Sequence, residues 1–346
     1  MEQLKRAFHL PNIWAHPAIA AIGNLGVVLF FVLSGFLITF LLLEENKRTG
    51  TVSIRKFYIR RILRIWPLYY LIVIIGFFVL PHIDFMKLSF VADEKTSSYI
   101  VLKSSLLFTL FPNVALAIFA TLPFISHIWS IGTEEQFYLS WPWLIKYSGR
   151  RKVWVIISVI VGYLGIKFII RMLPDVYVKS IIENFWDMFN IDCMAVGAFF
   201  AYAVHSGMQA TLRWVFAPAM QWITLLLTCC LLFTGTRFGM FTREIYALLF
   251  AVIIVNLGCN PKRVVSIENR FTGYLGKISY GLYMYHPIAI IIVLKILVML
   301  NLTGEVWVYT AGIVFTIALA SGSYHFLELS FIRLKDQFSK VLSGRN

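Results

Sequence analysis

Long apolar runs recur from one end of this 346-residue chain to the other, and they limit its possible folds more than any other feature. The chain is 59% hydrophobic and only 14% charged, whereas a soluble domain carries about 25% charged residues. Roughly 20 apolar residues form a helix long enough to cross a bilayer, and a helix satisfies its own backbone hydrogen bonds in lipid. We therefore predict an all-α, polytopic membrane protein, with one integral membrane domain over 1–346.

We expect nine transmembrane helices, at 20–43, 63–80, 128–146, 153–171, 186–205, 214–235, 244–259, 274–300 and 306–332. Residues 101–121 are also long enough to span, but a crossing there would break the alternation of inside and outside loops. Pro112-Asn113 interrupts this run, because proline removes a backbone donor and disfavours helix at the residue before it. We predict a broken or re-entrant segment, which is tolerated at membrane depth only where it is buried in protein or lines a cavity.

The net charge of +14 is explained by the loops rather than by a nucleic-acid-binding surface. Lysine and arginine gather in alternate loops, as the positive-inside rule produces. These loops are assigned to the cytoplasm of a plasma (inner) membrane protein, with 1–19 as an extracytoplasmic lead-in and 333–346 as a cytoplasmic tail. The four cysteines lie in or beside apolar runs without the Cys/His spacing of a zinc site, so no metal is expected.

Two adjacent carboxylates, Glu134 and Glu135, lie inside the apolar run 128–146. An ionisable group at membrane depth is costly and by default marks a functional site. Glu135 points about 100° away from Glu134 on a helix, so the two acids serve different neighbours. We favour catalysis or proton handling over a paired acid that locks two helices together, because such a lock rarely needs two adjacent acids. The cavity-lining candidates on this segment, the last two on the face of Glu134, are Trp129, Ser130 and Tyr138.

Three arginines, Arg60, Arg61 and Arg64, lie at the cytoplasmic mouth of the helix expected at 63–80. On a helix end they share one side and form a compact cationic site suited to phosphate groups. The alternative is topology setting and contact with anionic lipid headgroups, which needs only charge. Both interpretations stay open.

Isolated polar residues in other apolar runs are further candidates. Ser34 is more often a helix-interface hydrogen bond than a nucleophile. His286 follows Tyr283 by three residues, and the polar groups around it favour a cavity-lining role over a single interhelical contact. The remaining candidates line the cavity or, for the two acids, pair with a cation or a hydroxyl: Asp192, Tyr280 and Glu328.

Four motifs follow one another along the chain. They are Gly-Val-x-Leu-Phe-Phe-Val-Leu-Ser-Gly-Phe-Leu-Ile at 26–38, Phe57-Tyr58-x-Arg60-Arg61-x-x-Arg64-Ile65-x-Pro67, Trp129-Ser130 with Glu134-Glu135-Gln136-Phe137-Tyr138, and Ile278-Ser279-Tyr280 with His286. Together they closely resemble the membrane acyltransferase-3 family of bacterial O-acetyltransferases, which act on surface polysaccharides, peptidoglycan and related glycans. The resemblance covers nearly the whole chain.

The resemblance implies transfer of an acyl group, usually acetyl, from cytoplasmic acetyl-CoA to a hydroxyl of a glycan or lipid-linked sugar at the outer face. Acyl-CoA is then a co-substrate and not a permanently bound cofactor. By the resemblance, Arg60, Arg61 and Arg64 would receive the phosphates of CoA. Glu134 matches the family's glutamate, and His286 matches a recurrent polar position. The catalytic candidates are Glu134, Glu135, His286 and Ser34.

Two departures from the family pattern matter. Val28 stands where many members have Asp. The family's first helix normally carries an Arg, ten intervening residues and a His that is read as the catalytic base. Lys5 and His16 have this spacing, but Pro11 falls between them, and we interpret the match as accidental. We therefore expect a helix with Arg and His to precede Met1 in the gene, giving ten crossings, and the chain as given to be inactive or nearly so. Activity would instead require a base among residues such as His286 and His127.

Two other functions remain open at this point. A transporter or flippase for a glycan intermediate would also use a broken helix, buried acids and a basic mouth. A catalytically inactive, truncated relative is the second alternative. The acceptor, the acyl chain and the oligomeric state are not specified by the sequence.

Overall fold

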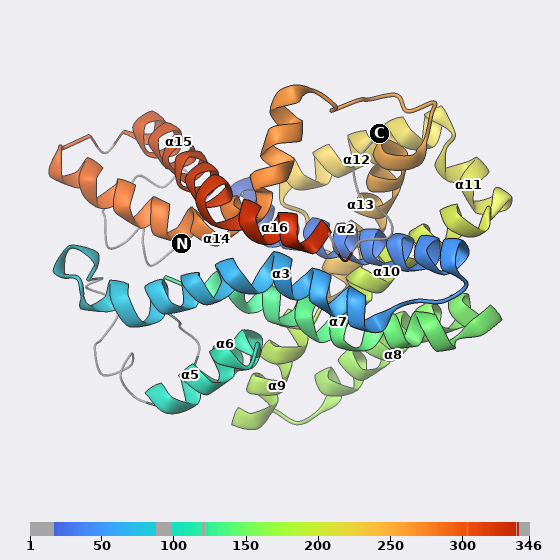
Figure 1. The fold of residues 1–346 in the computed structure, drawn as a ribbon, viewed down its shortest axis with the longest axis horizontal. Coiled ribbons are helices and arrows are strands. Elements are labelled where there is room, and N and C mark those ends of the chain that lie inside the picture. Colours follow the sequence, from blue (N-terminus) through green and yellow to red (C-terminus); the bar gives the residue numbers. More distant parts are fainter. Residues whose placement is uncertain are drawn as a thin grey trace. The chain divides into compact units, whose positions relative to one another are not determined.

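A computed structural model of the chain describes residues 17–87, 99–119, 122, 124–302, 304–336 and 338. These residues form helices and connecting segments without any strand, which confirms the predicted all-α class for the described part of the chain (Figure 1). Lys5 and His16, whose spacing we interpret as accidental, lie outside the described residues. The chain divides into two compact units, and helix α7 (Trp129–Tyr147) contributes to both.

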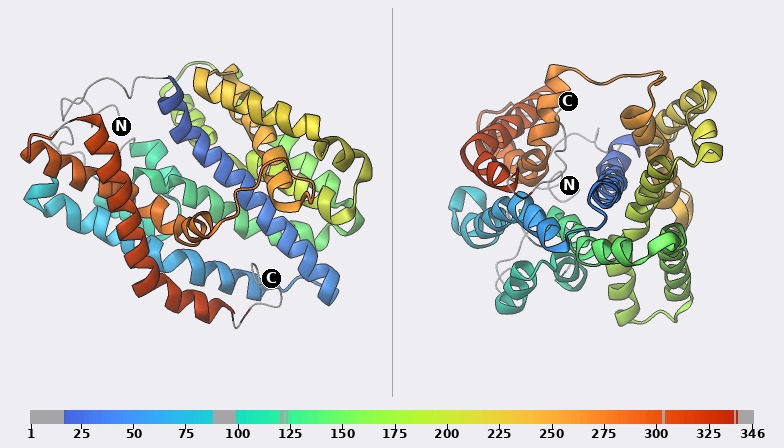
Figure 2. Two further views of the ribbon diagram at one scale, coloured as in Figure 1. Left: turned by 90° about the horizontal axis from the view of Figure 1, so that it is seen from above. Right: turned by 45° about the vertical axis from the view of Figure 1, so that its right-hand side comes forward.

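The first unit is built from the described parts of Arg55–Gly132 and Glu268–Asn346. In it α14 and α15 pack against each other, with Gly281 of α14 lying close to the backbone and Cβ of Ala320 (Figures 1 and 2). A larger residue at position 281 would have to displace α15 or the Glu328 side chain, so the glycine sets this separation. Its helices are α3 (Ile54–Val73), α5 (Ile100–Phe108), α6 (Pro112–Phe119), α14 (Arg270–Met299), α15 (Glu305–Ser323) and α16 (Leu329–Asp336), with short segments Ile74–Val79, Leu80–His82, Asp84–Met86, Ser126–Ile128 and Tyr324–Glu328.

The second unit is built from the described parts of Ile13–Ile54 and Thr133–Ile267. Helices α2 and α10 lie side by side in it (Figure 1), and two glycines permit their close approach. A Cβ on Gly35 would overlap the backbone of Met194, and one on Gly197 would overlap the carbonyl of Val32. Its helices are α2 (Pro17–Thr49), α8 (Lys152–Met172), α9 (Tyr177–Met188), α10 (Ile191–Ser206), α11 (Gln209–Val215), α12 (Pro218–Thr234) and α13 (Thr242–Cys259), with short turns at Gly149–Arg151 and Gly239–Phe241.

The predicted break in residues 101–121 is confirmed. Helix α5 ends at Phe108, and α6 begins at Pro112. Leu110 between them has a φ of 65°, a left-handed conformation that no helix continues through. Proline suits the first position of α6 because its missing N–H would have had no partner there.

The predicted number of nine membrane spans is wrong. The described residues contain seven helices long and apolar enough to cross a membrane, or up to eight if the pair α11 and α12, bent by 59°, is one span. The expected span at 128–146 is missing because α7 carries three charged side chains, Glu134, Glu135 and Lys146, within 19 residues. The seven are Ile22–Thr49, Ile54–His82, Gly149–Met172, Tyr177–Ser206, Gly239–Cys259, Arg270–Met299 and Glu305–Lys335.

Candidate functional site

Glu134 of α7 lies in a closed cluster with two hydroxyl groups of the second unit. The Ser34 hydroxyl on α2 donates to Glu134 Oε1 at 2.5 Å, and the Tyr138 hydroxyl donates to the same oxygen. Ser34 Oγ and Tyr138 Oη are themselves 2.5 Å apart. All three residues are at most 6% exposed. We call Ser34, Glu134 and Tyr138 the carboxylate cluster.

Local structure explains why these three side chains meet. Tyr138 follows Glu134 by four residues, so both lie on one face of α7. Ser34 comes from α2, one residue before the Gly35 contact with α10. A second bridge between α2 and α7 lies further along both helices, where Trp141 Nε1 donates to Thr39 Oγ1 at 2.8 Å. The carboxylate cluster is therefore held at two points between the same pair of helices.

The contacts of the carboxylate cluster converge on one carboxylate oxygen. Ser34 and Tyr138 each donate a hydroxyl proton to Glu134 Oε1, and a carboxylate oxygen can accept two hydrogen bonds. Two aligned donors therefore meet this buried carboxyl group.

A second polar cluster lies in the first unit and contains two histidines. The imidazole rings of His127 and His286 have their centroids 5.1 Å apart, and the Tyr283 ring lies 5.3 Å from that of His127. The Tyr283 hydroxyl donates to the backbone carbonyl of His127 at 2.6 Å, so Ser130 Oγ, also at 2.6 Å, must donate to Tyr283 Oη. We call His127, Ser130, Tyr283 and His286 the imidazole cluster.

The hydrogen bond of His286 determines which ring nitrogen carries its lone pair. His286 Nδ1 lies 2.7 Å from the Tyr283 carbonyl oxygen, and a carbonyl can only accept a hydrogen bond. Nδ1 therefore carries the proton, and Nε2 of the neutral ring has the lone pair that a base needs. Burial, together with the neighbouring His286, lowers the pKa of His127 to about 3, so His127 is neutral at physiological pH.

The three arginines of the predicted phosphate site lie on the first turns of α3. Arg60 donates to the backbone carbonyl of Phe338 at 3.1 Å. Arg61 lies over the Phe57 ring at 5.8 Å. Arg64 is exposed and near enough to Glu328 to interact with it electrostatically. Arg64 is thus the most accessible of the three for a ligand.

The other predicted residues have mainly structural partners. The Tyr280 hydroxyl donates to the Ile65 carbonyl at 2.9 Å. Glu328 accepts from Ser323 Oγ at 3.1 Å, which is the pairing with a hydroxyl that the sequence allowed. Trp129 and Glu135 are half-buried on α7. Neither belongs to the carboxylate cluster or to the imidazole cluster.

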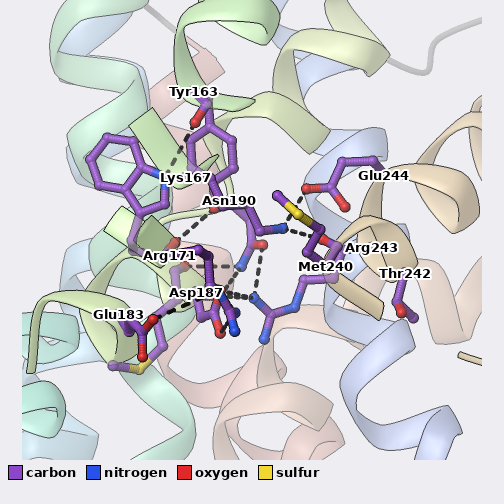
Figure 3. A network of polar contacts seen from close by, with 12 residues as sticks. Tyr163, Lys167, Arg171, Glu183, Asp187, Asn190, Met240, Thr242, Arg243 and Glu244 are labelled. Atoms are coloured by element: carbon purple, nitrogen blue, oxygen red, sulfur yellow. Dashed lines mark hydrogen bonds and ion pairs between the residues drawn. The ribbon is translucent and has the colours of Figure 1, made fainter. Parts of the chain in front are cut away.

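Asp192 belongs to a network in the second unit that the sequence analysis did not identify. It is 1% exposed and lies near Lys167 and Glu244. Lys167 Nζ binds Glu244 Oε1 and the Met240 carbonyl, each at 2.6 Å (Figure 3). The only signal in the sequence was a lysine inside an apolar run, and its partner lies in a distant helix. No group of three or more metal-ligating side chains occurs among the residues that the structure describes.

Comparison with known proteins agrees with the motifs. The family described as "Acyltransferase domain" matches residues 5–325. The putative peptidoglycan O-acetyltransferase YrhL of Bacillus subtilis (strain 168) is 25% identical over 350 residues, covering 93% of this chain and 51% of its own length. The peptidoglycan O-acetyltransferase OatA of Listeria monocytogenes serovar 1/2a is 25% identical over 346 residues, with coverages of 93% and 52%. The O-acetyltransferase OatA of Staphylococcus aureus (strain NCTC 8325 / PS 47) is 24% identical over 342 residues, with coverages of 88% and 52%.

This chain spans about half the length of the curated relatives it matches. No solved structure matches it. The family match extends over most of the sequence and includes both polar clusters and the arginines of α3. The chain therefore belongs to the acyltransferase-3 family.

Proposed function

We propose that this protein transfers an acyl group, most often acetyl, from acyl-CoA to a hydroxyl of a glycan or lipid-linked sugar at a membrane. The observation that carries the proposal is the family match over residues 5–325, with the motif residues Ser34, Glu134 and Tyr138 gathered in one buried cluster. Relatives named as peptidoglycan O-acetyltransferases support a glycan acceptor. The apolar helices support a multi-pass membrane enzyme.

The reaction requires a proton acceptor. The acceptor hydroxyl attacks the thioester carbonyl, an ester C–O bond forms, and the C–S bond to CoA breaks. The hydroxyl loses its proton, and the departing thiolate gains one, so the products are an ester and free CoA thiol. His286 is suited to this proton transfer, because its Nδ1 is fixed by the Tyr283 carbonyl and its Nε2 has the lone pair.

The carboxylate cluster would serve the same reaction in a different way. Ser34 and Tyr138 both donate to Glu134 Oε1. Because these two donors are already aligned, they lower the cost of a negative charge on the buried carboxyl group. Glu134 would then stabilise a positive charge that forms during the transfer.

For the donor, we propose that the CoA phosphates bind on the cytoplasmic side near Arg64, with Arg60 and Arg61 beside it. Arginine forks bind phosphate oxygens in pairs. The contact of Arg60 with the Phe338 carbonyl would connect donor binding with the end of the last described helix.

Acetyl transfer by the purified protein tests the proposal. The protein is reconstituted in lipid vesicles with labelled acetyl-CoA and glycan fragments that carry free hydroxyls, and acetyl ester on the glycan is measured. The assay uses the 346-residue chain and, in parallel, the same chain extended by any in-frame codons upstream of Met1. Ester formation by either form supports acyl transfer.

A transporter or flippase is the second candidate, and the break between α5 and α6 favours it, since discontinuous helices often line substrate paths. The same vesicles distinguish the two functions. A carrier moves unmodified glycan across the bilayer without consuming acetyl-CoA. A transferase consumes acetyl-CoA in proportion to the ester formed.

A further inference from the structure

The second unit contains a cavity of about 270 Å³ whose lining includes four cationic side chains. They are Lys167, Arg171, Arg237 and Arg243, and the one carboxylate among the lining residues is Asp187. The volume approaches the lower end of the usual range for ligand sites, about 300–1,000 Å³. It therefore has room for a single charged group with part of a sugar ring.

Most of the cationic side chains at this cavity are held in place by hydrogen bonds and ion pairs with neighbouring residues. Arg171 lies 3.2 Å from Asp187 Oδ2, and Arg243 NH1 binds the Asp187 carbonyl and, at 3.4 Å, Asn190 Oδ1 (Figure 3). Lys167 is 3% exposed and tied to Glu244. These pairs hold α8, α9 and α13 around the cavity.

Hydrogen-bond donors nevertheless exceed acceptors in the lining. A guanidinium has five N–H donors. In the described part of the chain, all the hydrogen bonds of Arg243 use NH1, and those of Arg171 use NH2. Arg237 is exposed and forms no hydrogen bond or ion pair with the described residues. An occupant that supplies several acceptor oxygens and a negative charge would match these donors.

The charges at the two ends of the helices indicate which side of the membrane the cavity faces. It includes Asn24 near the start of α2 and Arg243 at the start of α13. The opposite ends of α2, α8 and α13 carry more basic residues than the four at the cavity. They are Lys47, Arg48, Arg150, Arg151, Lys152, Lys262 and Arg263. By the positive-inside rule these basic ends lie in the cytoplasm, and the cavity opens on the outer side.

From these observations we propose that the cavity binds an oxyanion carried by the acceptor sugar, a carboxylate or a phosphate, and so positions the acceptor at the outer face. Arg237 makes the direct charge contact, Arg171 and Arg243 supply further N–H donors, and Asp187 orients the last two. That the occupant is an acceptor depends on the proposed acyl transfer. The binding itself is independent of it and is tested without turnover.

Binding of three soluble probes to the purified 346-residue chain tests the proposal. The probes are N-acetylmuramic acid, which has a carboxylate, N-acetylglucosamine 1-phosphate, which has a phosphate, and neutral N-acetylglucosamine. Affinities are measured by titration calorimetry in a zwitterionic detergent. We expect at least one anionic sugar to bind roughly tenfold or more tightly than the neutral sugar, as one charge-assisted contact produces. Which of the two binds shows whether the group is a carboxylate or a phosphate.

Two variants locate the binding. Arg237→Gln should reduce the preference for the anionic sugar about tenfold, and Arg237→Lys should restore part of it because the charge returns without the fork. The matched control is Arg213→Gln, which removes an exposed arginine of α11 that forms no hydrogen bond or ion pair with the described residues. It should bind all three sugars as the wild type does.

Three results would overturn the proposal. They are equal affinities for the charged and neutral sugars, an equal loss in Arg213→Gln, and complete displacement of the sugar by vesicles of phosphatidylglycerol, which would assign the cavity to lipid headgroups. Because no acyl-CoA is present, failure here leaves the proposed transfer untouched. Sugar binding without any ester formation would contradict only the transfer.

Discussion

The carboxylate cluster of the second unit and the imidazole cluster of the first differ in how far their polar side-chain atoms hydrogen-bond to one another. In the carboxylate cluster, Ser34, Glu134 and Tyr138 bind one another around a single oxygen atom, and all three are buried. In the imidazole cluster, Tyr283 and His286 donate to the backbone carbonyls of His127 and Tyr283, and Ser130 donates to the Tyr283 hydroxyl. His286 Nε2 binds none of the described residues.

This difference indicates which cluster can exchange a proton with a substrate. The hydroxyl groups of Ser34 and Tyr138 already donate to Glu134 Oε1, so they must leave it before they can donate to a ligand. A fixed imidazole with one lone pair can accept a proton without rearrangement. We therefore propose that the imidazole cluster transfers the proton and that the carboxylate cluster stabilises charge.

The largest effect is expected from Glu134→Gln. The amide keeps the shape of the side chain but cannot carry its negative charge, so acetyl transfer should fall by about 10²–10⁴-fold while membrane insertion stays intact. Glu45→Gln is the control, since Glu45 is a buried carboxylate that accepts from the Ser53 backbone N–H at 3.0 Å. It should lower the melting temperature and leave transfer unchanged. If Glu134→Gln behaves like this control, Glu134 is a structural residue.

A second large effect is expected at the candidate base. His286→Gln should lower kcat about 10²-fold with little change in KM, because the lone pair on Nε2 is lost. His82→Gln, which changes an exposed histidine on the same unit, should have no effect. Full activity of His286→Gln would show that His286 is not the base.

A moderate effect is expected at the donor site. Arg64→Ala should raise KM for acyl-CoA about tenfold while leaving KM for the acceptor unchanged, because it removes a phosphate contact. Arg64→Lys should recover only part of this loss. Arg55→Ala removes an exposed arginine from the same end of α3 and should leave both KM values unchanged. Equal changes in both KM values in Arg64→Ala would indicate lipid anchoring.

The smallest effect concerns pH and the imidazole cluster. The pKa of His127 is lowered from 6.5 to about 3 in the folded state, so folding favours the neutral ring. The contribution of the neutral ring to the free energy of unfolding is complete above pH 6.5 and is lost as the pH falls from 6.5 towards 3. At pH 5.5 the loss is about 1.4 kcal/mol. The difference between the melting temperatures at pH 7.5 and pH 5.5 should therefore be smaller in His127→Gln than in the wild type. A wild-type curve with the same pH dependence as His127→Gln would show that His127 is not buried as described.

Sequence patterns predicted the elements of this fold better than its contacts. Apolar periodicity and length identified the helices, and Pro112 located the break after α5, because these signals are local. The count of spans failed at α7, where the polar residues of the site reduce the apolarity by which a span is recognised. That Ser34 contacts Glu134 depends on the α2–α7 approach, which no local pattern encodes. The meeting of Lys167 with Glu244 depends equally on distant helices.

The most direct test of acyl transfer is the yield of acetyl ester on a glycan per acetyl-CoA consumed. It is measured in vesicles with the 346-residue chain and with the chain extended by upstream codons. At least one form should give a yield close to one ester per CoA released, and Glu134→Gln in that form should abolish it. No ester from either form, or glycan that crosses the bilayer unmodified while acetyl-CoA is untouched, would contradict the proposed transfer.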